Sequence, residues 1–352
     1  MKKQDVINLV KYHVQGDNES FVAETSKIAS DFNANGDEQI ARYLMELIAD
    51  ANFYVPQANY ANLRFLHKED PVTQPLFLPE TIEEDVISIA RSIKKKSGLS
   101  KFLFYGAPGT GKTESAYQIA RLLGRDLLVA DFEKLIDSRL GESAKNIALL
   151  FDEIKHVQYE RVIILFDEID ALVLDRINSN DLREMGRVTS AFLKGMDSLS
   201  EKIAIIATTN LYENFDKALI RRFDATISFD RYSKEDLVEI ADILMTSSLK
   251  KSQKSRQDVR LFNKILNQLV NIPYPGDLKR IIKTAVAFSN EENEYDYLRK
   301  IYLNLLSHNE EGDIQKLRDA GFTTREIEIL TKIPKSSVSR KLRKLDESDL
   351  RR

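Results

Sequence analysis

Residues 106–113 read Gly106-Ala-Pro-Gly-Thr-Gly-Lys112-Thr113, and this stretch decides the fold of the middle of the chain. It follows the apolar run 102–105, which predicts a buried strand, and it precedes residues 113–123, whose apolar positions are spaced as in a helix. A strand, a glycine-rich loop and a helix in this order are typical of a phosphate-binding loop. The alternative is an ordinary glycine-rich turn, which the spacing and both flanks disfavour.

Each position of the loop has a predicted task. The backbone expected to surround the phosphates is that of Gly106, Ala107, Pro108, Gly109, Thr110 and Gly111. Its N–H groups would converge on the anion, and the positive end of the following helix would add to the attraction. Lys112 would reach the β- and γ-phosphates, and the hydroxyl of Thr113 would hold Mg²⁺. The sequence therefore predicts a nucleotide site that includes a metal ion.

Composition excludes several other classes of protein. A chain of 352 residues suggests two or three domains, and its net charge of −3 gives no general sign of nucleic-acid binding. The absence of cysteine excludes disulfides, thiol catalysis and cysteine-bound zinc, and the four histidines form no metal-ligand pattern. No stretch approaches the roughly 20 apolar residues that a membrane helix needs. We therefore expect a cytoplasmic protein without a membrane span.

Strand-like runs alternate with helical patterns through residues 81–230. The expected strands are 102–105, 127–131, 162–166, 203–207 and 225–229. Continuous apolar strands placed between helices are typical of a parallel sheet with helices on both faces. The predicted fold class is therefore α/β, with a five-stranded parallel sheet in a nucleotide-binding domain.

Helical patterns and a linker account for the rest of the chain. Breaks at 17–18 and 35–37 predict about three short helices near the N-terminus, and we expect their small core to need neighbours or a partner. The segment 56–80 holds four of the chain's eight prolines, which is a linker composition. The expected divisions are an N-terminal bundle for partner docking (1–55), the linker (56–80), the α/β domain (81–230), a helical lid (231–292) and a C-terminal helical tail (293–352).

Acidic residues follow the third expected strand. The run 162–166 leads into Asp167, Glu168 and Asp170, at the position where open α/β sheets place their ligands. Asp167 could hold Mg²⁺ through its waters, and Glu168 could orient and deprotonate an attacking water. Turns also favour aspartate, so these acids are weak evidence alone and become strong evidence together with the phosphate loop upstream.

Two further polar segments complete the expected site. Asn210 follows the strand 203–207 and could fix the attacking water or sense the γ-phosphate, although turns also favour asparagine. Arg221 and Arg222 carry planar donor groups suited to phosphate. Because they lie beyond the last strand of the site, we expect them to reach the nucleotide of a neighbouring subunit. The alternative for them is a pair of surface salt bridges.

These segments occur in the order and spacing of the AAA ATPases, and the chain resembles that family over about residues 80–290. The resemblance implies ATP with Mg²⁺ as the ligands and an α/β domain followed by a helical lid. It also implies a homo-oligomeric ring, usually a hexamer, with the active site at the subunit boundary. It assigns Asn210 to the family's sensor-1 position and Arg221 and Arg222 to its arginine-finger positions, in a form similar to katanin and spastin.

Two other segments bear on the resemblance. Pro275-Gly276-Asp277-Leu278 is similar to the family's Gly-Ala-Asp-Leu segment, which implies that Gly276 lies near the adenine. AAA unfoldases grip polypeptide with an aromatic-apolar-glycine loop, whereas this chain carries Arg139 at the aromatic position of Ser138-Arg139-Leu140-Gly141. Arginine can lie flat on a chain but also attracts acidic groups or phosphate. The fold can also act as a ring that remodels a partner without threading it completely.

The C-terminal tail has helix signals of its own. Gly321 can end one helix, Thr323 and Glu326 form a capping box for the next, and a third helix follows. Residues 332–345 include six basic residues and no acid. The pattern resembles the helix-turn-helix of resolvases and sigma-factor-like regulators, which implies that residues 323–345 could contact DNA in the major groove. The alternative is a three-helix module used for packing or protein contact.

Three functions are compatible with these patterns. The first is Mg²⁺-dependent ATP hydrolysis by an AAA ring, coupled to remodelling or unfolding of a protein partner. The second is a DNA-associated ATPase switch whose tail binds DNA and whose nucleotide state recruits or controls an effector protein. The third is a nucleotide-binding scaffold that rarely turns over, against which the complete set of catalytic residue types argues. We expect the first.

Overall fold

The computed structural model spans the whole chain and describes residues 3–15, 17–34, 36–51, 60, 63–69, 76–130, 132–135, 142–170, 182–250, 256–290, 292–306 and 314–349. The chain divides into two compact units, Met1–Asn62 and Leu63–Arg352, and each is described by itself. Across the described ranges, no helix combines the length and the apolar character needed to cross a membrane.

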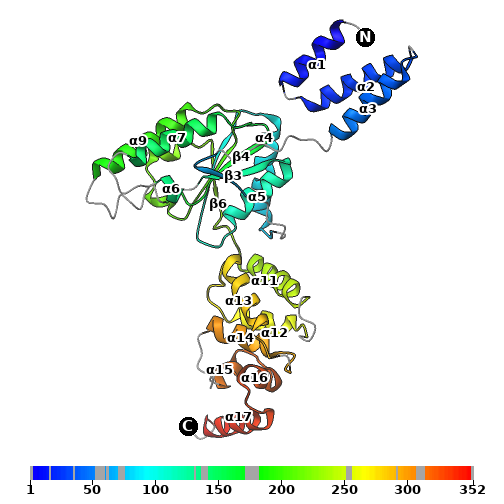
Figure 1. The fold of residues 1–352 in the computed structure, drawn as a ribbon. Coiled ribbons are helices and arrows are strands. Elements are labelled where there is room, and N and C mark those ends of the chain that lie inside the picture. The colour runs from blue at the N-terminus through cyan, green and yellow to red at the C-terminus, as the bar shows by residue number, and fades with distance from the viewer. Residues whose placement is uncertain are drawn as a thin grey trace. The chain divides into compact units, whose positions relative to one another are not determined.

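Three helices form the described part of the first unit: α1 (Lys3–Gln15), α2 (Asn18–Ala34) and α3 (Glu38–Ala51) (Figure 1). This confirms the three short helices predicted from the breaks in the apolar pattern. Helix α2 packs against both neighbours. Its described residues and those of α3 supply a small buried apolar set, whereas α1 leaves a stripe of aliphatic side chains exposed. The buried residues are Ile28, Ala29 and Ala41, and the exposed ones are Val6, Ile7, Val10 and Val14.

A six-stranded sheet forms the centre of the second unit, in the order β1-β3-β4-β5-β2-β6. Its strands are β1 (Leu66–Glu69), β2 (Lys101–Tyr105), β3 (Asp126–Ala130), β4 (Val162–Phe166), β5 (Ile205–Thr209) and β6 (Ala225–Ser228). Strands β2 to β6 run parallel, which confirms the five predicted parallel strands. Because β4, β5 and β2 are neighbours, the segments that follow them meet at one edge of the sheet.

Strand β1 corrects the linker prediction for residues 66–69. These residues pair antiparallel with β3, so that Leu66 lies opposite Ala130 and Glu69 opposite Leu127. Leu66 is the buried member of the four. An edge strand needs few apolar side chains, and the prolines around this one dominate the local composition. The sequence pattern therefore gave no strand signal here.

Helices cover both faces of the sheet, as the apolar strands predict (Figure 1). On one face, α4 (Glu80–Lys95) and α5 (Lys112–Leu123) share a buried cluster with Phe102 and Phe104 of β2. On the other face, α7 (Glu142–Lys155) packs against α9 (Leu182–Ser198), and the rings of Phe151, Phe166 and Phe192 meet at steep angles. Shorter elements are α6 (Phe132–Leu135), η2 (Tyr212–Asn214) and α10 (Lys217–Ile220).

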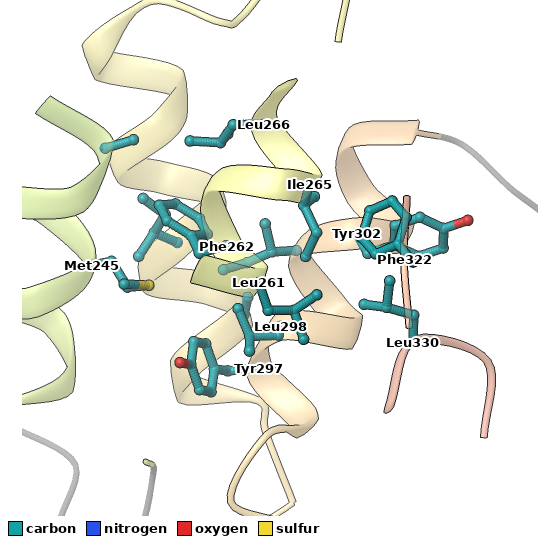
Figure 2. Packing of buried hydrophobic residues seen from close by; sticks show 14 of the residues in the cluster. Met245, Leu261, Phe262, Ile265, Leu266, Tyr297, Leu298, Tyr302, Phe322 and Leu330 are labelled. Carbon is teal, nitrogen blue, oxygen red and sulfur yellow. The ribbon is translucent and has the colours of Figure 1, made fainter. Parts of the chain in front are cut away.

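One apolar core joins the helices expected as a lid with those expected as a tail. Figure 2 shows part of this cluster, to which Tyr302, Phe322 and Leu330 all belong. The cluster runs from Leu237 to Leu342, so the two predicted segments share buried side chains, while the division between them stays a prediction. The helices are α11 (Lys234–Leu249), α12 (Val259–Asn267), α13 (Pro275–Ala287), α14 (Asp296–Leu306), α15 (Ile314–Asp319), α16 (Thr324–Thr331) and α17 (Lys335–Asp349).

An ion pair also links α12 to α16. Lys264 Nζ lies 2.8 Å from Glu326 Oε2 and donates to the carbonyl oxygen of Gly321 at 3.0 Å. Glu326 accepts from the N–H of Thr323 at 2.7 Å and donates its own N–H to Thr323 Oγ1 at 3.3 Å, which confirms the predicted capping box. Burial by itself raises the pKa of Glu326, but the hydrogen bonds from Lys264 and Thr323 outweigh it and hold that pKa below its usual value.

Candidate nucleotide site

The glycine-rich loop connects β2 to α5 with a backbone that favours glycine. Gly109 and Gly111 have φ angles of 79° and 93°, in the left-handed region that side chains with a Cβ seldom adopt. Gly111 is also the residue immediately before α5, so the loop ends at a helix N-terminus. This winding and the helix end are the features that a phosphate group requires.

The side chain of Lys112 lies inside the loop. It is buried, and its Nζ donates to the carbonyl oxygens of Gly106 at 2.7 Å and Ala107 at 2.9 Å, and to Asn210 Oδ1 at 2.8 Å. Burial lowers the pKa of Lys112, and nearby carboxylates, Asp230 foremost, oppose that shift. An ammonium group bonded to loop carbonyls can exchange them for phosphate oxygens, which bind it more strongly because they are charged.

The two residues predicted to hold Mg²⁺ are in contact. Thr113 Oγ1 donates to Asp167 Oδ1 at 2.8 Å, and Thr208 Oγ1 donates to the same oxygen at 2.6 Å. In the part of the chain that the structure describes, no group of three or more acidic or histidine side chains could hold a metal. Mg²⁺ is usually bound by one or two protein ligands together with waters and substrate phosphates. A hydroxyl and a carboxylate beside the phosphate loop therefore fit it.

Glu168 follows the strand end in an uncommon conformation. Its φ angle is 49°, its side chain is exposed, and its N–H donates to Thr208 Oγ1 at 2.9 Å. A residue other than glycine in this region is held there by its surroundings and is often functional. The exposed carboxylate is accessible to water, as its predicted task as a base requires.

A buried carboxylate fixes the backbone of Asn210. Asp170 accepts from the N–H of Asn210 at 3.0 Å and from the hydroxyl of Thr209, and the Thr209 hydroxyl accepts from the N–H of Leu211 at 3.0 Å. These bonds join the turn after β4 to the end of β5. They hold Asn210 where its side chain meets Lys112.

The two arginines have different surroundings. Arg222 forms a double hydrogen bond with Asp197 of α9, with Nε 2.9 Å from Oδ1 and Nη2 3.0 Å from Oδ2, and this bond raises the pKa of Arg222. Arg221 is exposed at the end of α10. Among the described residues, neither guanidinium forms a hydrogen bond with the phosphate loop. Their predicted role toward a neighbouring subunit stays a prediction.

Gly276 lies against the phosphate loop. Its N–H donates to the carbonyl oxygen of Gly109 at 2.8 Å, and a Cβ added at Gly276 would lie 2.7 Å from Gly109 Cα. Only glycine permits this approach between α13 and the loop. The contact puts Gly276 beside the nucleotide site, while its predicted place near the adenine stays a prediction.

The segment around this site matches a family model. Residues 102–231 match the model described as "ATPase family associated with various cellular activities (AAA)". These residues form an AAA ATPase domain. This match agrees with the resemblance of the motifs, and the matched range includes the phosphate loop, the acids after β4, Asn210 and both arginines.

Relatives share this domain with the chain. An "Uncharacterized AAA family ATPase y4kL" of Sinorhizobium fredii is 40% identical over 132 residues, which are 38% of this chain and 39% of the relative. The "Peroxisomal ATPase pex6" of Schizosaccharomyces pombe is 28% identical over 264 residues, 70% of this chain and 26% of the relative. The "ATPase family AAA domain-containing protein 2" of Mus musculus is 34% identical over 184 residues, which are 49% of this chain and 16% of the relative. The chain thus spans less than half the length of these relatives.

Two predictions from the sequence gain no test from these matches. Segment 138–141, which the sequence places at the position of the family's gripping loop, lies outside the described residues. The helix-turn-helix expected at 323–345 gains no support from the relatives, although helix α16 and most of helix α17 lie in this range. Contact of residues 138–141 with a substrate stays a prediction, and so does contact of residues 323–345 with DNA.

Sequence reasoning gave no role to Thr208 or Asp170, which the structure connects to the AAA motifs. Thr208 bonds Asp167 and the backbone of Glu168, and Asp170 bonds the backbone of Asn210. The available signal was weak: a threonine pair at the end of an otherwise apolar strand, and a third acid after two others. Both patterns also occur in ordinary strand ends and turns.

Proposed function

We propose that this chain works as a ring-forming, Mg²⁺-dependent ATPase that remodels or unfolds a protein partner. The observation that carries the proposal is the joint arrangement of Lys112 with Asn210 and of Thr113 with Asp167 at one loop. A scaffold that only stored nucleotide would not need a base or a sensing amide. Glu168 and Asn210 beside the phosphate loop therefore support turnover.

Each residue of the proposed site has a separate task. Lys112 exchanges the carbonyls of Gly106 and Ala107 for phosphate oxygens, and Thr113 and Asp167 hold the metal in register with them. Mg²⁺ bound with ATP supplies positive charge that stabilises the transferred phosphoryl group. Glu168 takes a proton from the attacking water, and Asn210 orients that water.

The ring is proposed from the arginines and the family. Arg221 and Arg222 would reach the nucleotide of the neighbouring subunit and stabilise negative charge on it, as arginine fingers do. The usual hexamer of the family is the proposed assembly. The exposed stripe on α1, with Val6, Ile7, Val10 and Val14, supports the N-terminal bundle as the docking site for the partner.

Two substitutions test the site. Lys112→Ala should abolish ATP binding, because Lys112 Nζ is the cation that the carbonyl oxygens of Gly106 and Ala107 hold inside the loop. Glu168→Gln should bind ATP without hydrolysing it and should favour the assembled ring, which analytical ultracentrifugation with ATP would detect. If Glu168→Gln hydrolysed ATP at the wild-type rate, the assignment of the base would be wrong. The protein that co-purifies with this trapped ring identifies the partner class.

One observation favours a second candidate, a DNA-associated ATPase switch with an effector protein. On α17, Val338 and Leu342 are buried in the shared core, which leaves Arg340, Lys341 and Lys344 exposed on one helix. Such a helix suits phosphates and base edges in a major groove. Truncation of the tail would remove core residues, so the sharper test is the double reversal Arg340→Glu with Lys344→Glu. This function would be excluded if the wild type did not bind duplex DNA. It would also be excluded if the double variant bound duplex DNA with the same affinity and the same salt dependence as the wild type.

A further inference from the structure

Two residues between β6 and α11 bond directly to the phosphate loop. The N–H of Ala107 donates to Asp230 Oδ1 at 2.7 Å. The hydroxyl of Tyr232 donates to the carbonyl oxygen of Thr110 at 2.7 Å. The connection that leads into the lid is therefore attached at two points of the loop, and Gly276 of α13 provides a third contact at Gly109.

Tyr232 belongs to both apolar cores of the second unit. Its half-buried ring packs against the cluster beneath α4 and α5 and also against the cluster of the C-terminal helices. It meets the ring of Tyr274 at a centroid distance of 5.7 Å and an angle of 66°. Burial raises the pKa of Tyr232, so its hydroxyl keeps the proton that it donates to Thr110. A shift of the lid against the sheet would move this hydroxyl relative to the loop.

Asp230 acts on the start of the loop and on its lysine. A Cβ added at Gly106 would lie 2.9 Å from Asp230 Oδ1, so the carboxylate occupies the space beside that glycine. Among the acids near Lys112, Asp230 exerts the largest charge effect, which favours the protonated lysine. One carboxylate therefore fixes an N–H of the loop and supports the positive charge inside it.

We propose that Asp230 and Tyr232 are positioning residues that hold the phosphate loop in its anion-binding shape and make this shape depend on the lid. The proposal rests on the proposed ATPase function and names the residues through which the lid acts on ATP affinity. An anion-binding loop needs its N–H groups directed inward and its carbonyl groups directed away from the phosphates. Tyr232 holds one such carbonyl, that of Thr110, and Asp230 holds the first turn of the loop.

The first test removes one hydroxyl. Tyr232→Phe keeps the ring in both cores, and we expect it to raise the Kd of a fluorescent ATP analogue and the KM for ATP roughly fivefold, the effect of one net hydrogen bond. The kcat should change less than twofold, because no group that contacts the reacting atoms is lost. Tyr274→Phe is the matched control, since it removes the hydroxyl of the adjacent ring, and it should leave Kd and KM unchanged.

The second test separates the hydrogen bond of Asp230 from its charge and needs no nucleotide. Asparagine retains an oxygen that can accept from Ala107, whereas alanine does not. Amide hydrogen exchange at residues 106–110 of the ATP-free protein should therefore be faster in Asp230→Ala and close to wild type in Asp230→Asn.

The outcomes distinguish this inference from the ATPase proposal. If the wild type failed to bind ATP, or if Lys112→Ala bound it equally well, the proposed function itself would fail. If the wild type bound ATP and Tyr232→Phe matched Tyr274→Phe in Kd, Tyr232 would have no positioning role. Equal amide exchange in Asp230→Ala and wild type would likewise remove Asp230. Melting temperatures of all four variants within a few degrees of wild type would exclude a general loss of folding as the cause.

Discussion

The carboxyl edge of the sheet and the C-terminal helices are held together by different kinds of contact. At the sheet edge, polar groups bond one another, as when Asp167 accepts from both Thr113 and Thr208. The C-terminal helices instead share an apolar cluster, with the Lys264–Glu326 pair as a polar link. Hydrogen bonds are directional, whereas apolar burial depends on area. Single substitutions should therefore change the reaction at the edge and the stability in the helices.

Substitution of the two arginines has the largest expected effect on the rate of ATP hydrolysis. It tests whether the site at the carboxyl edge of the sheet is completed by a neighbouring subunit. Because Asp197 holds Arg222 while Arg221 is exposed, we expect Arg221 to be the group that reaches the next nucleotide. Arg221→Ala should lower kcat for ATP by about 10³-fold or more, the effect of losing an arginine finger, with an unchanged melting temperature. Arg222→Ala should lower it much less. Steady-state ATPase assays and thermal melting measure both.

Mixed rings provide the control for this prediction. A ring that combines Arg221→Ala subunits with Lys112→Ala subunits contains boundaries where an intact phosphate loop faces an intact Arg221. Such mixtures should hydrolyse ATP faster than either variant alone. No recovery at any mixing ratio would mean that Arg221 acts within its own subunit or not at all.

The next effect belongs to the helical region and concerns stability. Phe262 is fully buried in the shared cluster, and Phe262→Ala should reduce the free energy of unfolding by about 3–5 kcal/mol. Val270 is 93% exposed, so Val270→Ala in the same region should change it by no more than about 0.5 kcal/mol. Denaturant unfolding compares the two. Similar values would mean that the C-terminal helices are not one cooperative core.

Each nucleotide motif is a short run of neighbouring residues, so the sequence alone is enough to predict it, while the tasks of its residues stay predictions. The loop at 106–113 and the acids after β4 are of this kind. Strand β1 escaped prediction because a short polar edge strand has no apolar pattern. The sequence also gave no role to Asp230 and Tyr232, because their role depends on contacts with a loop more than 100 positions earlier.

In the C-terminal helices, too, the sequence predicted local features but not contacts between distant residues. The capping box at Thr323 and Glu326 is local, and the sequence predicted it. The partner of the apolar face is not local: no spacing rule indicates that Phe322 and Leu330 share one buried cluster with Tyr302 of α14. Periodicity identifies an apolar face but not the surface that it covers.

A smaller effect is expected for Asp170, because this buried carboxylate contributes both to the stability of the fold and to the position of Asn210. Asp170→Asn leaves one acceptor oxygen for two donors, the N–H of Asn210 and the hydroxyl of Thr209. The unsatisfied buried group should cost about 1–3 kcal/mol of unfolding free energy. We expect kcat to fall roughly tenfold as Asn210 loses its fixed backbone, an effect of about 1.4 kcal/mol on the barrier. Thr208→Ser, which keeps its hydroxyl, should retain both rate and stability, and an equal loss there would contradict the assignment.

The smallest predicted effect tests the polar link of the helical region through pH. The pKa of Glu326 lies below its ordinary value of 4.5, so its ion pair stabilises the fold above about that pH and loses its effect as pH falls through the lowered pKa. Glu326→Gln should therefore destabilise the protein by about 1 kcal/mol at pH 7, and the difference from wild type should disappear in acid.

Urea unfolding at several pH values measures this difference, with the exposed Glu239→Gln as the control for a lost charge on the same group of helices. If the gap between Glu326→Gln and wild type were equal at every pH, it would arise from amide packing and not from the charge. The Lys264–Glu326 pair would then act as an ordinary packing contact, and the helical region would depend on apolar burial alone. A gap that closes in acid would instead show that one charged link joins α16 to α12, the same kind of directional contact that orders the sheet edge.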